Sequence, residues 1–160
     1  VVSGVRDFIG DQNKYELALG KAMGWAFVED QSKGAGYDYT TPDGTRVEAK
    51  FDWDSIKTGN HYLEFEQTSD GGETWVPSGF SLSVEEADLW AVINDEWLRI
   101  LQTEVLGTFV EENKHALKTV STRRGVNYNR AGQFSRGHLI PFGTLDEHVM
   151  LKARSPVSRS

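Results

Sequence analysis

Residues 38–50 read Asp-Tyr-Thr-Thr-Pro-Asp-Gly-Thr-Arg-Val-Glu-Ala-Lys and predict a β-hairpin. Residues 41–44, Thr-Pro-Asp-Gly, are a strong turn signal, because Pro suits the second position of a type I turn and Gly supplies the left-handed position that follows. A type I turn followed by a left-handed Gly closes a three-residue hairpin loop. In the register that this loop sets, Tyr39 faces Val47. The turn therefore determines which residues of the two strands lie opposite each other.

The same register places two carboxylates, Asp38 and Glu48, opposite each other. Directly opposed residues lie about 4.5–5.5 Å apart at Cβ, and like charges at that distance are destabilising. Lys50 follows Glu48 at a spacing of two, so both side chains point to one side of the sheet. Two carboxylates held together beside a lysine indicate a divalent-metal site. The alternative is a half-exposed strand with a polar outer face, the commonest reason for such alternation.

Composition limits the class of protein. A chain of 160 residues is long enough for one domain with a sizeable core, and we expect a single domain over residues 1–160. It contains no cysteine, which excludes disulfides and thiolate metal sites and fits a reducing compartment. No apolar run approaches the roughly 20 residues of a membrane span.

Charge is distributed unevenly along the chain. The net charge is −7, but residues 114–160 hold 9 Lys and Arg against 2 acidic residues, whereas residues 1–113 hold 8 basic and 22 acidic residues. An acidic body with a carboxylate cluster, followed by a basic and loop-rich segment, suits a polyanionic substrate. The alternative is a solvated acidic face with a basic tail.

Hydrophobic periodicity predicts helices and strands around the hairpin. A helix is predicted over residues 11–24, with Glu16 at the edge of its apolar stripe, where an ordinary surface carboxylate is the alternative interpretation. Strands are predicted at residues 25–29, 61–67, 73–76, 89–93, 97–101 and 138–142, with a turn at 94–95. Capping signals predict helices that begin at Ser83, Thr103 and Thr144. A loop is predicted over residues 119–136 and a frayed tail from residue 154.

This order of elements, with Asp38, nine further residues and then Glu48-x-Lys50, resembles the PD-(D/E)xK nuclease superfamily, which includes restriction endonucleases, Holliday-junction resolvases and phage exonucleases. Residues 78–90 also look like a run that follows the core motif in some phage and resolvase-like members. The resemblance covers roughly residues 11–101. It departs from the motif at Tyr37, which precedes Asp38 in place of Pro.

The resemblance implies a fold and a site. The fold would be α/β (α+β), a restriction-endonuclease-like core with a mixed central β-sheet flanked by helices. The catalytic residues would be Glu16, Asp38, Glu48 and Lys50. Asp38, Glu48 and Glu16 would bind Mg²⁺, for which Mn²⁺ can substitute, because hard cations prefer carboxylate oxygens and water. Gln67 would contact the attacking water or the lysine.

The resemblance also implies a metal-dependent deoxyribonuclease, either endonuclease or exonuclease, that hydrolyses DNA phosphodiester bonds and is structure-specific in the manner of a resolvase. The candidate DNA contacts are Lys33, Arg123, Arg124, Arg130 and Arg136. A homodimer would fit relatives that cut two strands, and the expected location is the cytoplasm of a bacterial or phage-infected host cell. Two alternatives are a catalytically silent nuclease fold that serves as a DNA-binding or assembly module, and a small acidic α/β protein with no nucleic-acid role.

Overall fold

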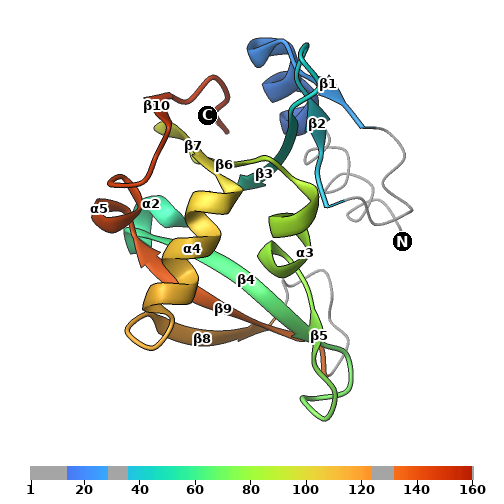
Figure 1. Cartoon of the computed structure of the whole chain (residues 1–160), viewed down its shortest axis with the longest axis vertical. Coiled ribbons are helices and arrows are strands. Elements are labelled where there is room, and N and C mark those ends of the chain that lie inside the picture. The colour runs from blue at the N-terminus through green and yellow to red at the C-terminus, as the bar shows by residue number, and fades with distance from the viewer. Residues whose placement is uncertain (1–13, 29–35, 124–131, 160) are drawn as a thin grey trace.

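The computed structural model describes residues 14–28, 36–123 and 132–159. The strands form two sheets, which lie in different halves of the molecule in Figure 1. The first sheet has the order β1-β2-β3-β6-β7-β10, with β1 Ala26–Phe27, β2 Tyr39–Thr40, β3 Arg46–Phe51, β6 Leu89–Ile93, β7 Trp97–Gln102 and β10 Leu151–Arg154. The second has the order β5-β4-β9-β8, with β4 Asn60–Thr68, β5 Val76–Pro77, β8 Lys118–Arg123 and β9 Phe134–Pro141.

Helices accompany both sheets. Residues 14–23 are helical, and the later helices are α2 Ser55–Thr58, α3 Phe80–Glu86, α4 Thr103–Asn113 and α5 Phe142–Leu145. In the six-stranded sheet β3 and β6 are parallel, while the other neighbours are antiparallel. The prediction of a mixed α+β chain with a mixed central sheet flanked by helices is confirmed at this level. Among the described residues, no helix is both long and apolar enough to span a bilayer.

The predicted hairpin is present in the predicted register. Tyr39 pairs with Val47, and the amide of Thr41 donates to the carbonyl of Thr45 at 2.8 Å. Gly44 has φ +86°, the left-handed conformation that its place in the turn requires. Asp43 accepts hydrogen bonds from residues of the turn itself, which lower the pKa of its carboxyl below its usual value. The turn chemistry therefore sets the pairing of β2 with β3.

The central strand β6 is buried on both faces, as its unbroken apolar sequence predicts. Ala91 and Ile93 belong to a core cluster with Leu19 of the first helix, whereas Trp90 and Val92 belong to a second cluster with Leu63 of β4. Strand β3 runs beside β6, with Glu48 level with Trp90. The polar face of β3 therefore looks toward the second sheet and not toward open solvent.

In the C-terminal third the strand predicted at 138–142 is confirmed within β9, whereas the predicted loop and tail are wrong where the structure describes them. Residues 119–136 were expected to form a loop, yet residues 118–123 form β8 and residues 134–141 form β9, both in the second sheet. The tail expected from residue 154 is anchored, because Arg154 ends β10 and Arg159 pairs with Asp95 at 3.0 Å. The sequence of β8 and of the first half of β9 is mostly polar, so it did not predict strands there. These strands are stabilised by pairing with distant segments and not by local signals.

The starts of two helices were also mispredicted. Ser83 lies inside α3, which begins three residues earlier after Gly79, and Thr144 lies inside α5, which begins at Phe142. Helix α4 does begin at Thr103, but it ends at Asn113 and not near residue 116. Ser83 is buried, so its hydroxyl serves contacts in the interior instead of a helix end. Strand 61–67 is confirmed within β4, but it belongs to the second sheet, which was not predicted.

Candidate metal centre

A cavity of about 500 Å³ opens where the first helix, β2, β3 and β4 meet. Glu16 from the helix, Asp38 from the end of β2, and Glu48 and Lys50 from β3 all line it. The structure thus brings together the four residues that the sequence predicts to be catalytic. The rest of the lining consists of Ala49, Phe51, Asp52, His61, Tyr62, Glu64, Gly79 and Trp90.

Asp38 lies directly before β2, which begins at Tyr39. Its amide donates to the carbonyl of Val47 at 2.8 Å, and its carbonyl accepts from the amide of Val28 at 2.8 Å. Its carboxylate oxygen Oδ2 accepts from the amide of Ala49 at 3.0 Å. The side chain therefore reaches across to the backbone of β3 at the position between Glu48 and Lys50, and this bond fixes it beside both.

Glu48 is the most buried carboxylate of the cavity, with 7% of its surface exposed. Burial raises the pKa of Glu48 to about 8; the charge of Lys50 opposes this shift, and a hydrogen bond with the Asp38 carboxyl adds to it. The Nζ atom of Lys50 lies 3.3 Å from Oε1, and the hydroxyl of Ser83 lies 3.4 Å from Oε2. Glu48 is therefore held in its neutral form more readily than an exposed carboxyl, beside the Asp38 side chain.

Tyr39 ties the first helix to the sheet. Its hydroxyl donates to the backbone carbonyl of Glu16 at 2.6 Å. Burial raises the pKa of Tyr39, and the negative charges of Asp38, Glu16 and Glu48 raise it further, so all three carboxylates lie near this hydroxyl. A Cβ on Gly20 would lie 3.2 Å from the Tyr39 ring, so glycine at this position lets the helix lie close to β2. This close packing holds Glu16 at the cavity.

Lys50 is supported by a buried network that the sequence did not reveal. Its Nζ atom lies 5.4 Å from the centre of the Trp90 ring, a cation–π distance. The indole Nε1–H of Trp90 donates to Nε2 of His61 at 3.0 Å, and Nδ1 of His61 lies 2.9 Å from Oδ2 of Asp52. Because an indole N–H only donates, Nε2 accepts, and Nδ1 carries the ring proton that is donated to Asp52.

His61 is fully buried, with 0% of its surface exposed. Both ring nitrogens of His61 have hydrogen-bond partners, Trp90 and Asp52. We therefore assign His61 the role of positioning Trp90, and not that of transferring a proton to a substrate. One signal for this network was present in the sequence, since Asp52 follows Lys50 at a spacing of two and therefore shares its face of the strand. Trp90 and His61 offered no comparable signal, because their contact joins two different sheets.

The donor set of the cavity fits a hard divalent cation. Mg²⁺ binds one or two carboxylates and retains several waters. Asp38 and Glu48 supply two adjacent carboxylates, and Glu16 faces the same cavity. Within residues 14–28, 36–123 and 132–159, no group of three His, Cys, Asp or Glu side chains is arranged to hold an ion by protein ligands alone.

The predicted DNA contacts are only partly described. Lys33, Arg124 and Arg130 lie outside the described residues, and Arg123 ends β8 without a described side chain. Arg136 in β9 pairs with Glu66 at 3.0 Å and lies 3.6 Å from the Trp75 ring centre. Its side chain remains 39% exposed, so this guanidinium retains a surface despite its internal partners.

Gln67, the remaining predicted site residue, lies in β4 opposite Ser135 and Val76. The described lining of the cavity does not include it. Strand β4 instead reaches the cavity with His61, Tyr62 and Glu64, on the near side of an irregularity between Glu64 and Glu66. Glu64 is therefore the β4 carboxylate at the cavity, one that the sequence analysis did not single out.

The chain was also compared with known proteins. Comparisons with protein-family models, with curated proteins and with solved structures gave no significant match.

Proposed function

We propose that this chain is a divalent-metal-dependent deoxyribonuclease, which hydrolyses phosphodiester bonds of DNA. The observation that carries this proposal is the buried Glu48 carboxyl beside the half-buried Asp38 carboxyl, with the Lys50 ammonium 3.3 Å from Glu48. Two carboxyl groups beside each other, one of them buried, are unfavourable unless a proton or a cation compensates their charge. A cavity that opens onto such a pair is suited to a cation.

The resemblance on which the proposal draws rests on the order of elements. The helix with Glu16 is followed by β1 and by β2 and β3 with the Asp38 and Glu48-x-Lys50 motif, and then, after α2, β4 and β5, by α3 and the parallel strand β6. This arrangement supports a restriction-endonuclease-like core within the six-stranded sheet. The second sheet, with β4 and β9 as its longest strands, would be an addition to that core.

In the proposed reaction a water oxygen attacks phosphorus, the bond to the leaving oxygen breaks, and the leaving oxygen takes up a proton. Bound Mg²⁺ would supply a more acidic water and offset the negative charge that develops on the phosphate. Asp38 and Glu48 would hold the cation, with Glu16 as a direct or water-mediated ligand. Lys50 orients the attacking water or donates to a phosphate oxygen. Trp90 and His61 keep the lysine in place.

The test is cleavage of linear duplex, single-stranded, nicked and branched DNA with Mg²⁺ or Mn²⁺. The wild type is expected to cut at least one of them, and Lys50→Ala to cut about 10²–10⁴-fold more slowly, the range for a group that transfers or stabilises a proton. Lys57→Ala, an exposed lysine in α2, is the matched control and should cut normally. Absence of cutting on all four substrates would exclude the enzyme. Retained DNA binding without Mn²⁺ binding would instead favour the silent module.

A further inference from the structure

A second and larger hollow, about 1790 Å³ in volume, lies away from the carboxyl pair. It runs between α3 and α4 and extends to the hairpin turn. Its floor includes Leu63 and Phe65 of β4, with Phe80 and Val84 of α3. Leu63 and Phe80 are buried residues of the second hydrophobic cluster, so the floor of the hollow lies directly on that cluster. We refer to this hollow as the α3–α4 groove.

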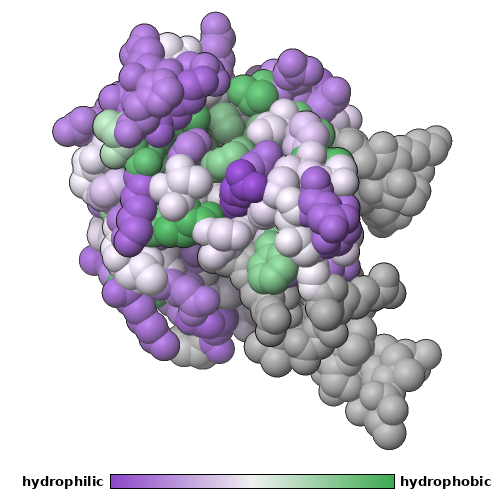
Figure 2. Space-filling model, turned by 90° about the horizontal axis from the view of Figure 1, so that it is seen from below, coloured by the Kyte–Doolittle hydropathy of each residue, from purple (hydrophilic) through white to green (hydrophobic). Residues whose placement is uncertain are grey.

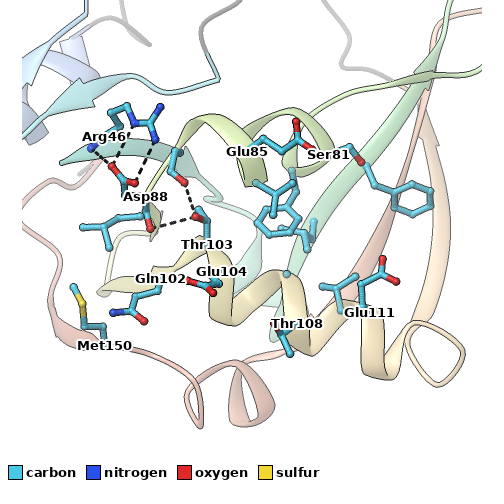
Figure 3. Close-up of a pocket in the computed structure, with 18 of the residues that line it drawn as sticks. Arg46, Ser81, Glu85, Asp88, Gln102, Thr103, Glu104, Thr108, Glu111 and Met150 are labelled. Atoms are coloured by element: carbon cyan, nitrogen blue, oxygen red, sulfur yellow. Dashed lines mark hydrogen bonds and ion pairs between the residues drawn. The ribbon is translucent and has the colours of Figure 1, made fainter. Parts of the chain in front are cut away.

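One face of α4 is turned toward the groove along the length of the helix. Glu104, Gly107, Thr108 and Glu111 line it, at the spacing of three, four and seven residues that follows one side of a helix. Gly107 lies against α3, since a Cβ there would be 3.1 Å from Val84, whereas Thr108 beside it is exposed, and acidic side chains stand at both ends of this face. Figure 3 shows Glu104 and Glu111 on α4 and Glu85 on α3 around the groove. The 11 residues of α4 span about 16 Å, which is enough for about three turns of a second helix laid alongside.

The groove has an acidic rim. Six carboxylates and two cations line it, a formal charge of −4 without its histidines. The carboxylates are Asp43, Glu85, Asp88, Glu104, Glu111 and Glu112. The two cations are already matched, since Arg46 lies 3.3 Å from Asp88 and Lys114 lies 3.1 Å from Glu111. Burial and the charge of Lys114 lower the pKa of His138, so this imidazole adds little positive charge at neutral pH.

The lining of the α3–α4 groove therefore combines apolar side chains with negative charge. Figure 2 shows apolar areas lying between hydrophilic groups on the face seen from below. Met150, a flexible side chain that is 54% exposed, also lines the groove. Such a rim repels a nucleic acid and attracts cations. An apolar groove beside a helix face is the geometry in which amphipathic helices bind.

We propose that the α3–α4 groove binds an amphipathic helix of a partner protein, with apolar side chains on one face and Lys or Arg beside them. The apolar face of that helix would pack on Phe65, Val84 and Val110, and its cations would meet the carboxylates of the rim. The partner helix would lie over Thr108, which is small and exposed. The groove and the carboxyl pair share no lining residue, so this interaction does not depend on the proposed nuclease activity.

The test uses a fluorescent 14-residue peptide of Leu and Lys, with Leu at helical spacing, and measures anisotropy on the full chain. Two peptides are controls: one with Glu in place of Lys, and one with the same Leu and Lys residues in an order without helical spacing. The amphipathic Leu/Lys peptide is expected to bind at least about tenfold more tightly than either control. If the control peptide without helical spacing binds equally well, the attraction is a non-specific one to an acidic protein, and the proposal is overturned.

Variants locate the binding. Glu85→Lys with Glu112→Lys takes the formal charge of the rim from −4 to zero, and each new lysine lies near a helix C-terminus, where a cation is favourable. Binding should weaken about tenfold or more, because the net attraction for the peptide is lost and the two new lysines repel its cations. Glu73→Lys with Glu96→Lys makes the same charge change at exposed positions outside the groove and should leave binding unchanged. Equal weakening by both double variants would contradict the assignment.

Shape is tested without charge. Thr108→Trp fills the middle of the exposed face of α4 and should also abolish binding of the Leu/Lys peptide. Unchanged binding by this variant would overturn the groove as the site. Sedimentation of the unmodified chain alone tests the remaining occupant. If the chain is a dimer, and Glu85→Lys with Glu112→Lys converts it to a monomer, the groove binds a second copy of this chain. That result would refute the proposal that a helix of a partner protein binds there.

Discussion

The Nζ atom of Lys50 lies 3.3 Å from Oε1 of Glu48, two residues earlier on the same strand. This contact is the only attractive charge that opposes the burial of Glu48 among the causes that set its pKa. It links the protonation of the carboxyl pair to the lysine that we propose acts on the substrate. The stability of the folded chain should therefore depend on pH through Glu48, and on a cation that takes the place of its proton.

The first prediction concerns stability against pH. The pKa of Glu48 is about 8 in the folded protein and 4.5 as its ordinary value, so between these values the folded state holds more protons than the unfolded state. The contribution of Glu48 to the free energy of unfolding therefore falls as pH rises through this window, by at most about 1.4 kcal/mol per pH unit. Glu48→Gln should lack this slope in urea unfolding with a chelator present. Parallel pH curves for wild type and Glu48→Gln would contradict the assignment, and Glu85→Gln serves as the exposed control.

The second prediction concerns the cation. Mn²⁺ should bind more tightly as pH rises, because it binds the deprotonated carboxylates and displaces their proton. At a concentration about 100 times its Kd, the ion should stabilise the fold by about 2.7 kcal/mol. Asp38→Asn should weaken binding about tenfold or more in calorimetry, whereas Asp43→Asn, in the exposed turn, should not. Equal affinity in the two variants would refute the assigned ligand.

The third prediction concerns the support for Lys50. Trp90→Phe keeps an aromatic ring at this position but removes the indole N–H that donates to His61. The buried Nε2 atom of His61 is then left without its donor. The expected loss of stability is about 1–3 kcal/mol, and Trp97→Phe, at a half-buried position, should cost less. Nitrogen NMR should show the Nδ1–H tautomer of His61 in the wild type. An Nε2–H tautomer would disprove the hydrogen-bond assignment.

The fourth prediction concerns the packing of the first helix. Gly20→Ala places a Cβ 3.1 Å from the Trp25 carbonyl and 3.2 Å from the Tyr39 ring. The helix must then move away from β2, at a cost of about 1–3 kcal/mol, and Glu16 moves with it. Gly143→Ala is the matched control, because nothing lies within 4 Å of its Cβ, and it should be neutral or slightly stabilising. Thermal unfolding of the two variants makes the comparison, and a stable Gly20→Ala would show that the helix is not held by this contact.

Several parts of the fold followed from local sequence. The 41–44 turn predicted the pairing of Tyr39 with Val47, and the apolar run 89–93 predicted a buried strand joined to 97–101 by a turn. These features are local, because a tight turn and the alternation around it set the register without any distant residue. The carboxyl pair followed from the same register, and so did the side of β3 on which Lys50 lies.

Other parts depended on contacts between distant residues. Strand β9 pairs with β4 across more than 65 residues; its apolar end was predicted as the strand 138–142, but its polar, Gly-containing first half carries little strand signal of its own. Ser83 looked like a helix cap, but its buried position near Glu48 gave its hydroxyl another partner, and α3 began at Phe80 instead. Tertiary packing overrides local propensity at such positions.

By itself, the sequence determined the hairpin, its register and the meeting of Asp38 with Glu48, because turn geometry and the twofold period of a strand act over a few residues. The tertiary structure decided that Glu48 is buried, that Trp90 and His61 stand behind Lys50, and that α3 and α4 leave an acidic groove between them. Burial and the contacts between sheets arise only when segments far apart in the chain pack together. The carboxylates were readable in the sequence, but the environment that raises the pKa of Glu48 was not.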